Sequence, residues 1–282
     1  MLRKIQITVM LMIALLSSCS VVQAESPDFA DFGLKTHDFG IAFEVYEFDY
    51  EEEPDLMGEN GTIFGIAGEY TFRDWIKNSS CLDMMFRAEA RCAFGKVDYD
   101  GAYQDGTPFS YSGIDDTTFE IRGLAGLDRF ILDDKVLATA YIGLGFRQLD
   151  DNAGVMDGGY DRQSQYLYFP IGCEFVLQSQ NNWLCTLNAE YNHLINGRQT
   201  SELSALDISG LGDVKNKQKH GNGFRGSARF DYKVDGKKKF FIEPYVRLWR
   251  VGDSEVETSG IYAIMEPKNT TREIGVNVGI PF

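Results

Sequence analysis

The last eleven residues, Arg272 to Phe282, read REIGVNVGIPF. On one side of an extended chain, every second position is apolar: Ile274, Val276, Val278, Ile280 and Phe282. The other side carries polar residues, glycines and a proline. Because successive side chains of a strand point to opposite faces, this alternation predicts a β-strand with one apolar and one polar face. Such a strand can face hydrocarbon on one side and a polar interior on the other.

The same alternation recurs along the chain, in segments close to the ~9–11 residues that cross a bilayer as a tilted strand. The expected strands are residues 37–49, 62–73, 82–94, 118–129, 136–148, 164–177, 183–193, 224–233, 239–251 and the closing segment. The third is the clearest, since Met84 and Phe86 share a face opposite Arg87 and Glu89. Proline cannot donate to a strand ladder, so Pro170 and Pro244 predict a bulge or a misplaced boundary in two of these strands.

The links between the expected strands alternate in length. They are short after the second, fourth, sixth and eighth strands and long after the others. Short turns at one end and long loops at the other are typical of transmembrane barrels. We therefore predict an all-β fold, a transmembrane antiparallel up-and-down β-barrel of about ten strands. A soluble periplasmic β-sandwich is the alternative. Aromatic side chains are expected near the two rims: Tyr46, Phe72, Trp75, Tyr99, Trp183 and Trp249.

An apolar closing strand that ends on Phe282 resembles that of bacterial outer-membrane β-barrel proteins. The resemblance to this superfamily of small barrels covers the mature chain. It implies residence in the outer membrane of a Gram-negative-type envelope, in contact with the lipid bilayer and lipopolysaccharide. It also implies that the outer-membrane assembly machinery reads Phe282 as its signal.

The amino-terminal residues have the pattern of an export signal. A basic start is followed by a short apolar run and a small-residue site that ends at Ala24, so residues 1–24 are predicted to be a signal peptide. Cleavage before Cys19 is the alternative, since Leu16-Ser17-Ser18-Cys19 resembles a lipoprotein signal in which the cysteine becomes the acylated first residue. Residues 25–36 are then a periplasmic segment, and residues 37–282 the barrel domain.

Charge and cysteine content narrow the partners. The net charge of −15 argues against nucleic acid, whose phosphates it would repel. Four cysteines remain after either cleavage, Cys81, Cys92, Cys173 and Cys185. Only Cys173 and Cys185 flank one hairpin on one face, and they are either bonded or, like the other two, small apolar fillers.

The predicted inner face is charged. It holds seven arginines, no lysine and a larger number of carboxylates. Guanidinium groups present a planar fork to carboxylates and suit a confined polar network. The candidate network is Arg87, Glu89, Arg91, Glu120, Arg122, Arg147, Glu190, Arg225, Arg229, Asp231, Glu243 and Arg247. It can be a structural lattice that plugs the barrel or the lining of a narrow pore.

Acidic residues gather in the expected long loops. The first carries DYEEEPD at residues 49–55, and later loops add Asp115, Asp116, Asp150 and Asp151. No spacing matches a calcium loop, so the pattern favours a solvated acidic rim. No catalytic, cofactor or metal site is predicted.

The expected barrel is similar in size and topology to the ten-stranded omptin proteases, which use paired aspartates and an Asp-His couple at the outer rim. Here Asp150, Asp151 and His193 top two strands, with Glu190 three residues before the histidine. Adjacent aspartates alternate faces, and no Asp-x-His sequence occurs. The sequence therefore favours a non-enzymatic structural or surface-interaction protein. A narrow channel for ions or small polar solutes is the alternative, and a rim hydrolase is favoured less.

Overall fold

The computed structural model describes residues 32, 34–54, 56–75, 83–102, 106–132, 134–178, 182–234 and 237–282. The expected signal peptide, Cys19 and Cys81 lie outside these residues.

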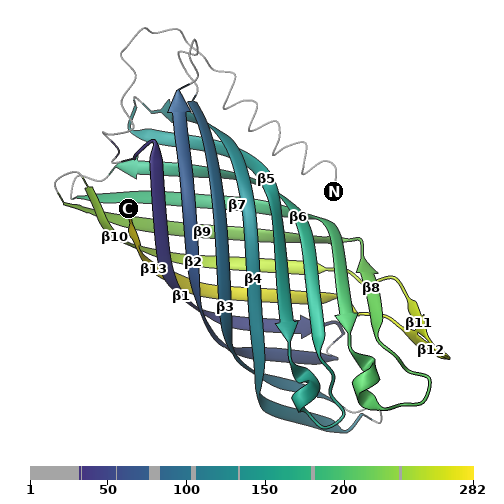
Figure 1. Ribbon diagram of the computed structural model, residues 1–282. Coiled ribbons are helices and arrows are strands. Elements are labelled where there is room, and N and C mark those ends of the chain that lie inside the picture. The colour runs from purple at the N-terminus through teal and green to yellow at the C-terminus, as the bar shows by residue number, and fades with distance from the viewer. Residues whose placement is uncertain are drawn as a thin grey trace.

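Antiparallel strands form a closed barrel (Figure 1). Its strands are β1 (His37–Glu52), β2 (Met57–Trp75), β3 (Asp83–Ala102), β4 (Pro108–Ile131), β5 (Val136–Asp151), β6 (Arg162–Gln178), β7 (Trp183–Ser201), β9 (Gly221–Val234), β10 (Lys237–Val251) and β13 (Asn269–Pro281). Each pairs with its neighbour along the chain, and β1 pairs with β13 to close the ring. The backbone N–H of Phe282 donates to the carbonyl of Phe39 at 2.8 Å, which continues the closing ladder.

We call the end of the barrel that carries the long loops the loop end. Several short elements lie there. The strand β8 (Val214–Gln218) pairs with the last residues of β7, and β11 (Glu257–Ser259) forms a hairpin with β12 (Tyr262–Ile264). Two 3-10 turns, η2 (Ala153–Val155) and η3 (Leu203–Leu206), lie in loops of the same end. The opposite end, which carries the short links, we call the turn end.

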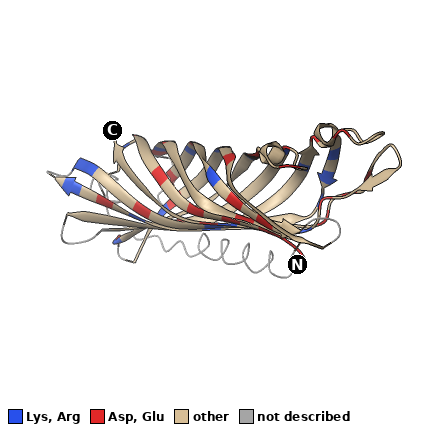
Figure 2. Cartoon of the chain, turned by 90° about the horizontal axis from the view of Figure 1, so that it is seen from below, with Lys and Arg blue, Asp and Glu red and all other residues tan. Residues whose placement is uncertain are grey.

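The outer surface of the barrel is apolar along its middle. We call these exposed side chains the apolar belt: Phe39, Ile41, Phe43, Phe64, Ile66, Phe86, Phe94, Phe119, Ile121, Ile142, Leu144, Leu187, Phe224, Ile242, Val246, Ile274, Val278 and Ile280. Charged residues occur along the same strands (Figure 2), but Glu44, Arg147 and others point inward and are buried. A soluble protein has the reverse arrangement. An apolar outside around a polar inside is the fold of an outer-membrane β-barrel protein.

The predicted fold class is therefore confirmed, and the soluble β-sandwich is wrong. Among the described residues, no helix has the length and the apolar character needed to span a bilayer.

The strands are longer than the alternation of apolar residues indicated. Residues 98–117 were expected to be a loop, but β3 continues to Ala102 and β4 already starts at Pro108. Their outward positions there are polar, such as Lys96, Asp98 and Asp100, so the apolar pattern stops while the ladder continues. The barrel therefore extends past the belt at the loop end.

The two prolines do not produce the expected bulges. Pro170 pairs with Asn192, and Pro244 pairs with Val276, inside continuous strands. The ladder is interrupted only on the other side of each proline, toward β5 and β9 respectively, and resumes there in the same register. Because proline lacks an N–H, a few residue pairs are lost on one side of the strand, but the register of the strand does not change. The register shifts lie elsewhere, at Val97/Asp98, Leu167/Tyr168 and Lys238/Phe240.

Cys173 and Cys185 are free thiols. Their register partners are Ala189 and Leu177, so the two cysteines are offset along the hairpin and do not face each other.

Two aromatic residues expected at the rims lie inside. Tyr46 and Trp249 are almost fully buried, and each is paired with a glycine of the neighbouring strand, Gly275 and Gly223.

Candidate functional site in the barrel interior

The twelve residues of the predicted polar network all face the interior. Ten strands contribute the wall, and their inward positions follow the period-two alternation, so side chains far apart in sequence meet across the lumen. We call the resulting set of ion pairs the lattice. It has three groups, which are described in turn.

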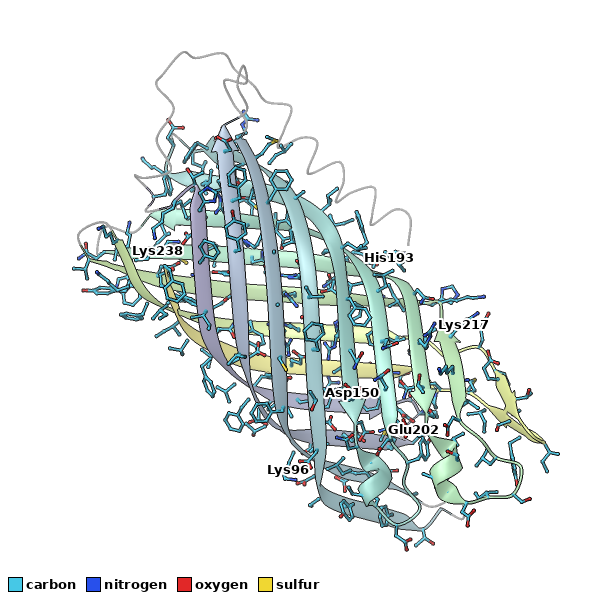
Figure 3. The ribbon with its side chains drawn as sticks, in the orientation of Figure 1. Lys96, Asp150, His193, Glu202, Lys217 and Lys238 are labelled. Carbon is cyan, nitrogen blue, oxygen red and sulfur yellow. The ribbon has the colours of Figure 1, made fainter. Side chains whose placement is uncertain are left out.

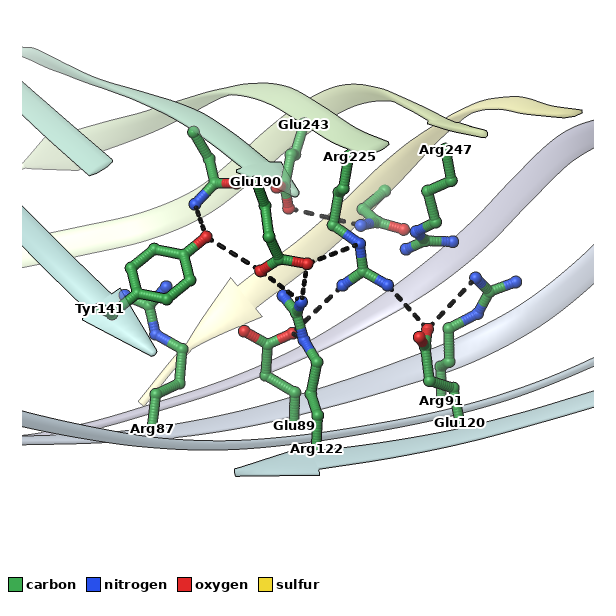
Figure 4. Close-up of polar contacts among 12 residues, drawn as sticks. Arg87, Glu89, Arg91, Glu120, Arg122, Tyr141, Glu190, Arg225, Glu243 and Arg247 are labelled. Carbon is green, nitrogen blue, oxygen red and sulfur yellow. Dashed lines mark hydrogen bonds and ion pairs between the residues drawn. The ribbon is translucent and has the colours of Figure 1, made fainter. Parts of the chain in front are cut away.

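The central group surrounds Glu190 (Figure 4). Arg122 donates to Glu190 and to Glu89, both at 2.7 Å, and the Tyr141 hydroxyl donates to Glu190 at 3.0 Å. Arg225 lies beside them and donates to Glu120 at 2.7 Å. Glu190 is thus a fully buried carboxylate held by a guanidinium and a phenol.

The second group surrounds Glu273 on β13. Three guanidinium groups reach it, Arg91 and Arg147 at 2.8 Å and Arg247 at 3.1 Å. Glu44 lies next to Arg91 and Arg247, at 3.2 and 3.1 Å. Because these residues come from strands near both ends of the chain, the group ties together the strands that close the barrel.

The third group lies nearer the turn end. Glu174 bonds Arg87 at 2.7 Å and Arg73 at 3.2 Å, and Arg229 pairs with Glu69 and Asp231. Glu243 accepts a bond from the Asn277 amide at 3.3 Å.

Two cations of this group were missed. Arg73 ends an expected strand whose alternation places it inward, so the sequence could have shown it. Lys238, which precedes the expected strand 239–251, pairs with Asp38 at 3.0 Å. The expectation of an interior without lysine is therefore wrong, because β10 starts at Lys237, two residues before the expected strand.

A small cavity remains within the lattice. Its volume is about 130 Å³, and Glu69, Arg87, Ser227, Arg229 and Glu243 are among the residues that line it. Pockets for small molecules are usually ~300–1,000 Å³ and mostly apolar. The cavity is smaller than these and mainly charged.

Apolar clusters lie on both sides of the lattice. At the turn end, Phe32 and Leu34 precede β1 and pack inside the barrel against Leu137, Val176 and Leu184. At the loop end, a larger cluster fills the interior: Tyr46, Phe48, Tyr50, Ile63, Ala93, Val97, Ile114, Leu149, Ala153, Met156 and Tyr245. The lattice therefore has an apolar cluster on either side of it along the barrel axis.

A separate ionic cluster lies near the loop end. Arg162 bonds Glu52 at 3.0 Å, Glu59 at 2.6 Å and Asp151 at 2.7 Å. The Tyr50 hydroxyl lies 3.2 Å from a carboxylate oxygen of Glu52 and 3.2 Å from one of Glu266, and it donates its hydrogen to one of the two at a time.

The cluster corrects part of the expected acidic rim. Glu52, Asp116 and Asp151 were expected in solvent, but they are buried inside the barrel. In the loop before β13, burial and then the nearby Glu52 carboxylate raise the pKa of Glu266 to about 7.

The candidate rim residues of a hydrolase are not brought together. Asp150 accepts bonds from Gln148 and Gln163, whereas the next residue, Asp151, points inward to Arg162. His193 is exposed on the outer surface of β7 (Figure 3), whereas Glu190 points into the lattice. Within the part of the chain that the structure describes, no three His, Cys, Asp or Glu side chains are grouped as metal ligands.

Comparisons with known proteins identify no family for the chain. No family model and no curated protein matches the chain. Among solved structures, it is similar to the outer membrane protease OmpT from Escherichia coli, with 7% identity, a TM-score of 0.48, and coverage of 87% of this chain and 96% of that one. The translocator domain of the autotransporter NalP from Neisseria meningitidis has 11% identity and a TM-score of 0.40 over 88% and 90% of the two chains. Neisserial surface protein A has 9% identity and a TM-score of 0.34 over 86% and 97%.

Proposed function

We propose that this chain is a non-enzymatic structural or surface-interaction protein of the outer membrane, with a lumen that is closed to solutes. Its barrel holds a rigid position in the bilayer, and its loop end presents polar strand ends and loops outside it. In this proposal the export signal is residues 1–24, the assembly machinery reads Phe282, and lipopolysaccharide surrounds the loop end. Phe282 is 57% exposed beside the apolar belt, where such a reader could reach it.

The observation that carries the proposal is the filling of the lumen. The lattice crosses the middle of the barrel, and an apolar cluster lies on either side of it along the barrel axis. A barrel of about this strand number is only slightly wider than one that its own side chains fill. An ion on its way through would have to pass the apolar cluster inside the loop end, which is costly for a charge.

A narrow channel is the second candidate, and the small charged cavity is the observation that favours it. Its lining of carboxylates and guanidinium groups would suit ions or small polar solutes if a path through Phe32 and Leu34 opened.

Planar-bilayer recording of the purified full-length protein distinguishes the two. We expect no steady conductance from the protein, under conditions in which a known porin conducts. Steady openings whose size changes in Arg91→Gln or Arg147→Gln would contradict the sealed lumen and establish the channel, because both side chains lie within the lattice.

A further inference from the structure

We propose that the outer surface of β7, β8 and the loop-end part of β10 binds phosphate groups of anionic lipid in the outer leaflet. We call this surface the basic face and define it by Arg198, Lys215, Lys217, Lys219 and Arg250, all of which are exposed. The inference rests on the placement of the protein in an outer membrane. It does not depend on whether the lumen conducts.

The strand register puts these cations on one side of the sheet. Arg198 is the direct partner of Lys217, and Thr200 is the partner of Lys215. Directly paired residues of antiparallel strands point to the same face. Lys219 follows Lys217 at the next position of the same parity, and Figure 3 shows Lys217 and His193 on the same side of the barrel. Arg198, Lys215, Lys217 and Lys219 thus share one outward surface.

The basic face begins where the apolar belt ends. On β6 and β7, the outward Leu167 is level with Asn196, and the next outward pair toward the loop end is Gln165 with Arg198. Two residues along a strand span about 7 Å, which is roughly the distance from the edge of the hydrocarbon layer to the lipid headgroups.

The same step occurs on β9 and β10. Leu248 pairs with Phe224, a belt residue that is 51% exposed, and Arg250 pairs with Asn222 two positions further. The cations therefore lie at the level that lipid headgroups occupy on two separate parts of the wall.

Most cations of the basic face lack a carboxylate partner. Lys219 pairs with Glu255, but in the described part of the chain no Asp or Glu oxygen lies within 4.0 Å of the charged nitrogens of Arg198, Lys215, Lys217 or Arg250. The outward residues paired with or next to them on β6, β7 and β9 are neutral, namely Gln163, Gln165, Thr200 and Asn222, while the exposed carboxylates Asp213 and Glu255 lie near Lys215 and Lys217 without forming an ion pair with either.

The other side of the loop end is different. The outward positions of β1 and β3 to β5 there are acidic: Glu47, Asp49, Glu51, Asp98, Asp100, Asp115 and Asp150. Its exposed cations are paired, Lys96 with Asp115 at 2.7 Å and Arg272 with Glu51 at 3.3 Å. In a chain of net charge −15, unpaired positive charge is thus concentrated on one outward surface at the loop end.

Phosphate on a lipid fits this surface best. Arginine binds phosphate oxygens in a bidentate fork, and lysine adds a mobile point charge. Long basic side chains beside an apolar surface extend their charged ends toward headgroups. Ile195, which is 48% exposed three positions before Arg198 in β7, and the apolar belt offer contact to the acyl chains of the same molecule. A soluble phosphate would leave these apolar contacts unused.

The test uses the full-length protein in neutral detergent micelles, with diphosphorylated lipid A as the probe and the same lipid without phosphates as the comparison. The variant Arg198→Gln/Lys217→Gln removes two unpaired cations. The control Lys96→Gln/Arg272→Gln removes two exposed cations from the acidic side. Equilibrium binding is measured at low and high salt.

We expect the first variant to weaken binding of the phosphorylated lipid about tenfold or more, since each basic group near a charged headgroup contributes substantially. The control should stay within about twofold, as expected for exposed pairs. Binding by the unmodified protein should fall with salt and be weak for the dephosphorylated lipid.

Equal binding of the two lipids, or equal losses in the two variants, would overturn the proposal. Equal competition by a soluble polyanion would also overturn it, because it would show a general polyanion site. If Arg198→Gln/Lys217→Gln does not fold, Lys215→Gln/Arg250→Gln, which also removes two unpaired cations, takes its place with the same expectation. The conductance experiment is independent, so failure here and failure of the sealed lumen are distinguishable.

Discussion

Arg122 shows at the level of one residue why arginine, and not lysine, dominates the interior. Its guanidinium reaches Glu89 through Nε and Glu190 through Nη1, so one cation serves two carboxylates in different directions. A lysine ammonium is a single point and cannot hold this planar geometry. Breaking such a buried pair leaves a charge without compensation, which is far more costly than the pair itself is stabilising.

We therefore expect Arg122→Gln to destabilise the barrel by about 3–5 kcal/mol, because the side chain of Glu190 is fully buried. Urea unfolding in micelles, followed by tryptophan fluorescence, measures this. Lys96→Gln breaks an exposed pair and should cost only about 0–1 kcal/mol. Arg122→Gln/Glu190→Gln removes both charges and should recover part of the loss. A double variant as unstable as the single one would refute this account.

Glu266 predicts a pH dependence at the loop end. In the folded protein its pKa is about 7, against an ordinary value of 4.5. The folded state therefore holds the proton that the unfolded chain releases, and stability falls as pH rises from about 4.5 to about 7. The same unfolding assay across this range should show a smaller slope for Glu266→Gln. The exposed Glu51→Gln serves as the control, and an unchanged slope in Glu266→Gln would exclude Glu266 as the source.

At the level of the strands, interior aromatic rings lie directly across from glycines. Tyr141 is paired with Gly172, Tyr168 with Gly145, and Phe241 with Gly279. A Cβ atom at any of these glycines would collide with the facing ring. The ring thus packs flat against the glycine of the neighbouring strand, and it covers the glycine backbone, which has no side chain of its own.

Gly172→Ala should therefore destabilise the protein by about 1–3 kcal/mol, as overpacking does. The added methyl group displaces Tyr141, whose hydroxyl donates to Glu190. Gly123→Ala is a matched control, because a Cβ at Gly123 meets nothing within 4 Å. Equal unfolding midpoints for the two variants would show that the pairing has no role in packing.

Strand positions were predictable because alternation survives wherever one face meets lipid. Strand ends were not, since the extensions of β3 and β4 beyond the belt carry polar residues on the outside and match a loop in composition. The prolines were misjudged for a related reason. At Pro244 the missing N–H interrupts only the ladder to β9. The ladder to β13, on the other side of the strand, is continuous and keeps the register.

For the molecule as a whole, the period-two alternation of side chains predicted which charged residues face inward. It could not predict the apolar clusters that lie on the turn-end and loop-end sides of these residues. The closure at the turn end uses Phe32 and Leu34, which precede the barrel and have no alternating pattern. The loop-end cluster includes Ala153 and Met156 from a loop that folds inward. Both depend on tertiary contacts that local pattern does not encode. The same holds for the three carboxylates that meet at Arg162.

The lattice also constrains the order in which the chain can fold. Arg91 and Glu273 are separated by 182 positions, and Arg247 and Glu44 by 203. Neither contact can exist until the first and last strands have met, so the loop-closure entropy must be overcome before these charges are neutralised. A partly inserted chain would expose unpaired guanidinium and carboxylate groups to the hydrocarbon layer of the bilayer. We therefore expect strand docking, ring closure and charge compensation to coincide when the barrel folds.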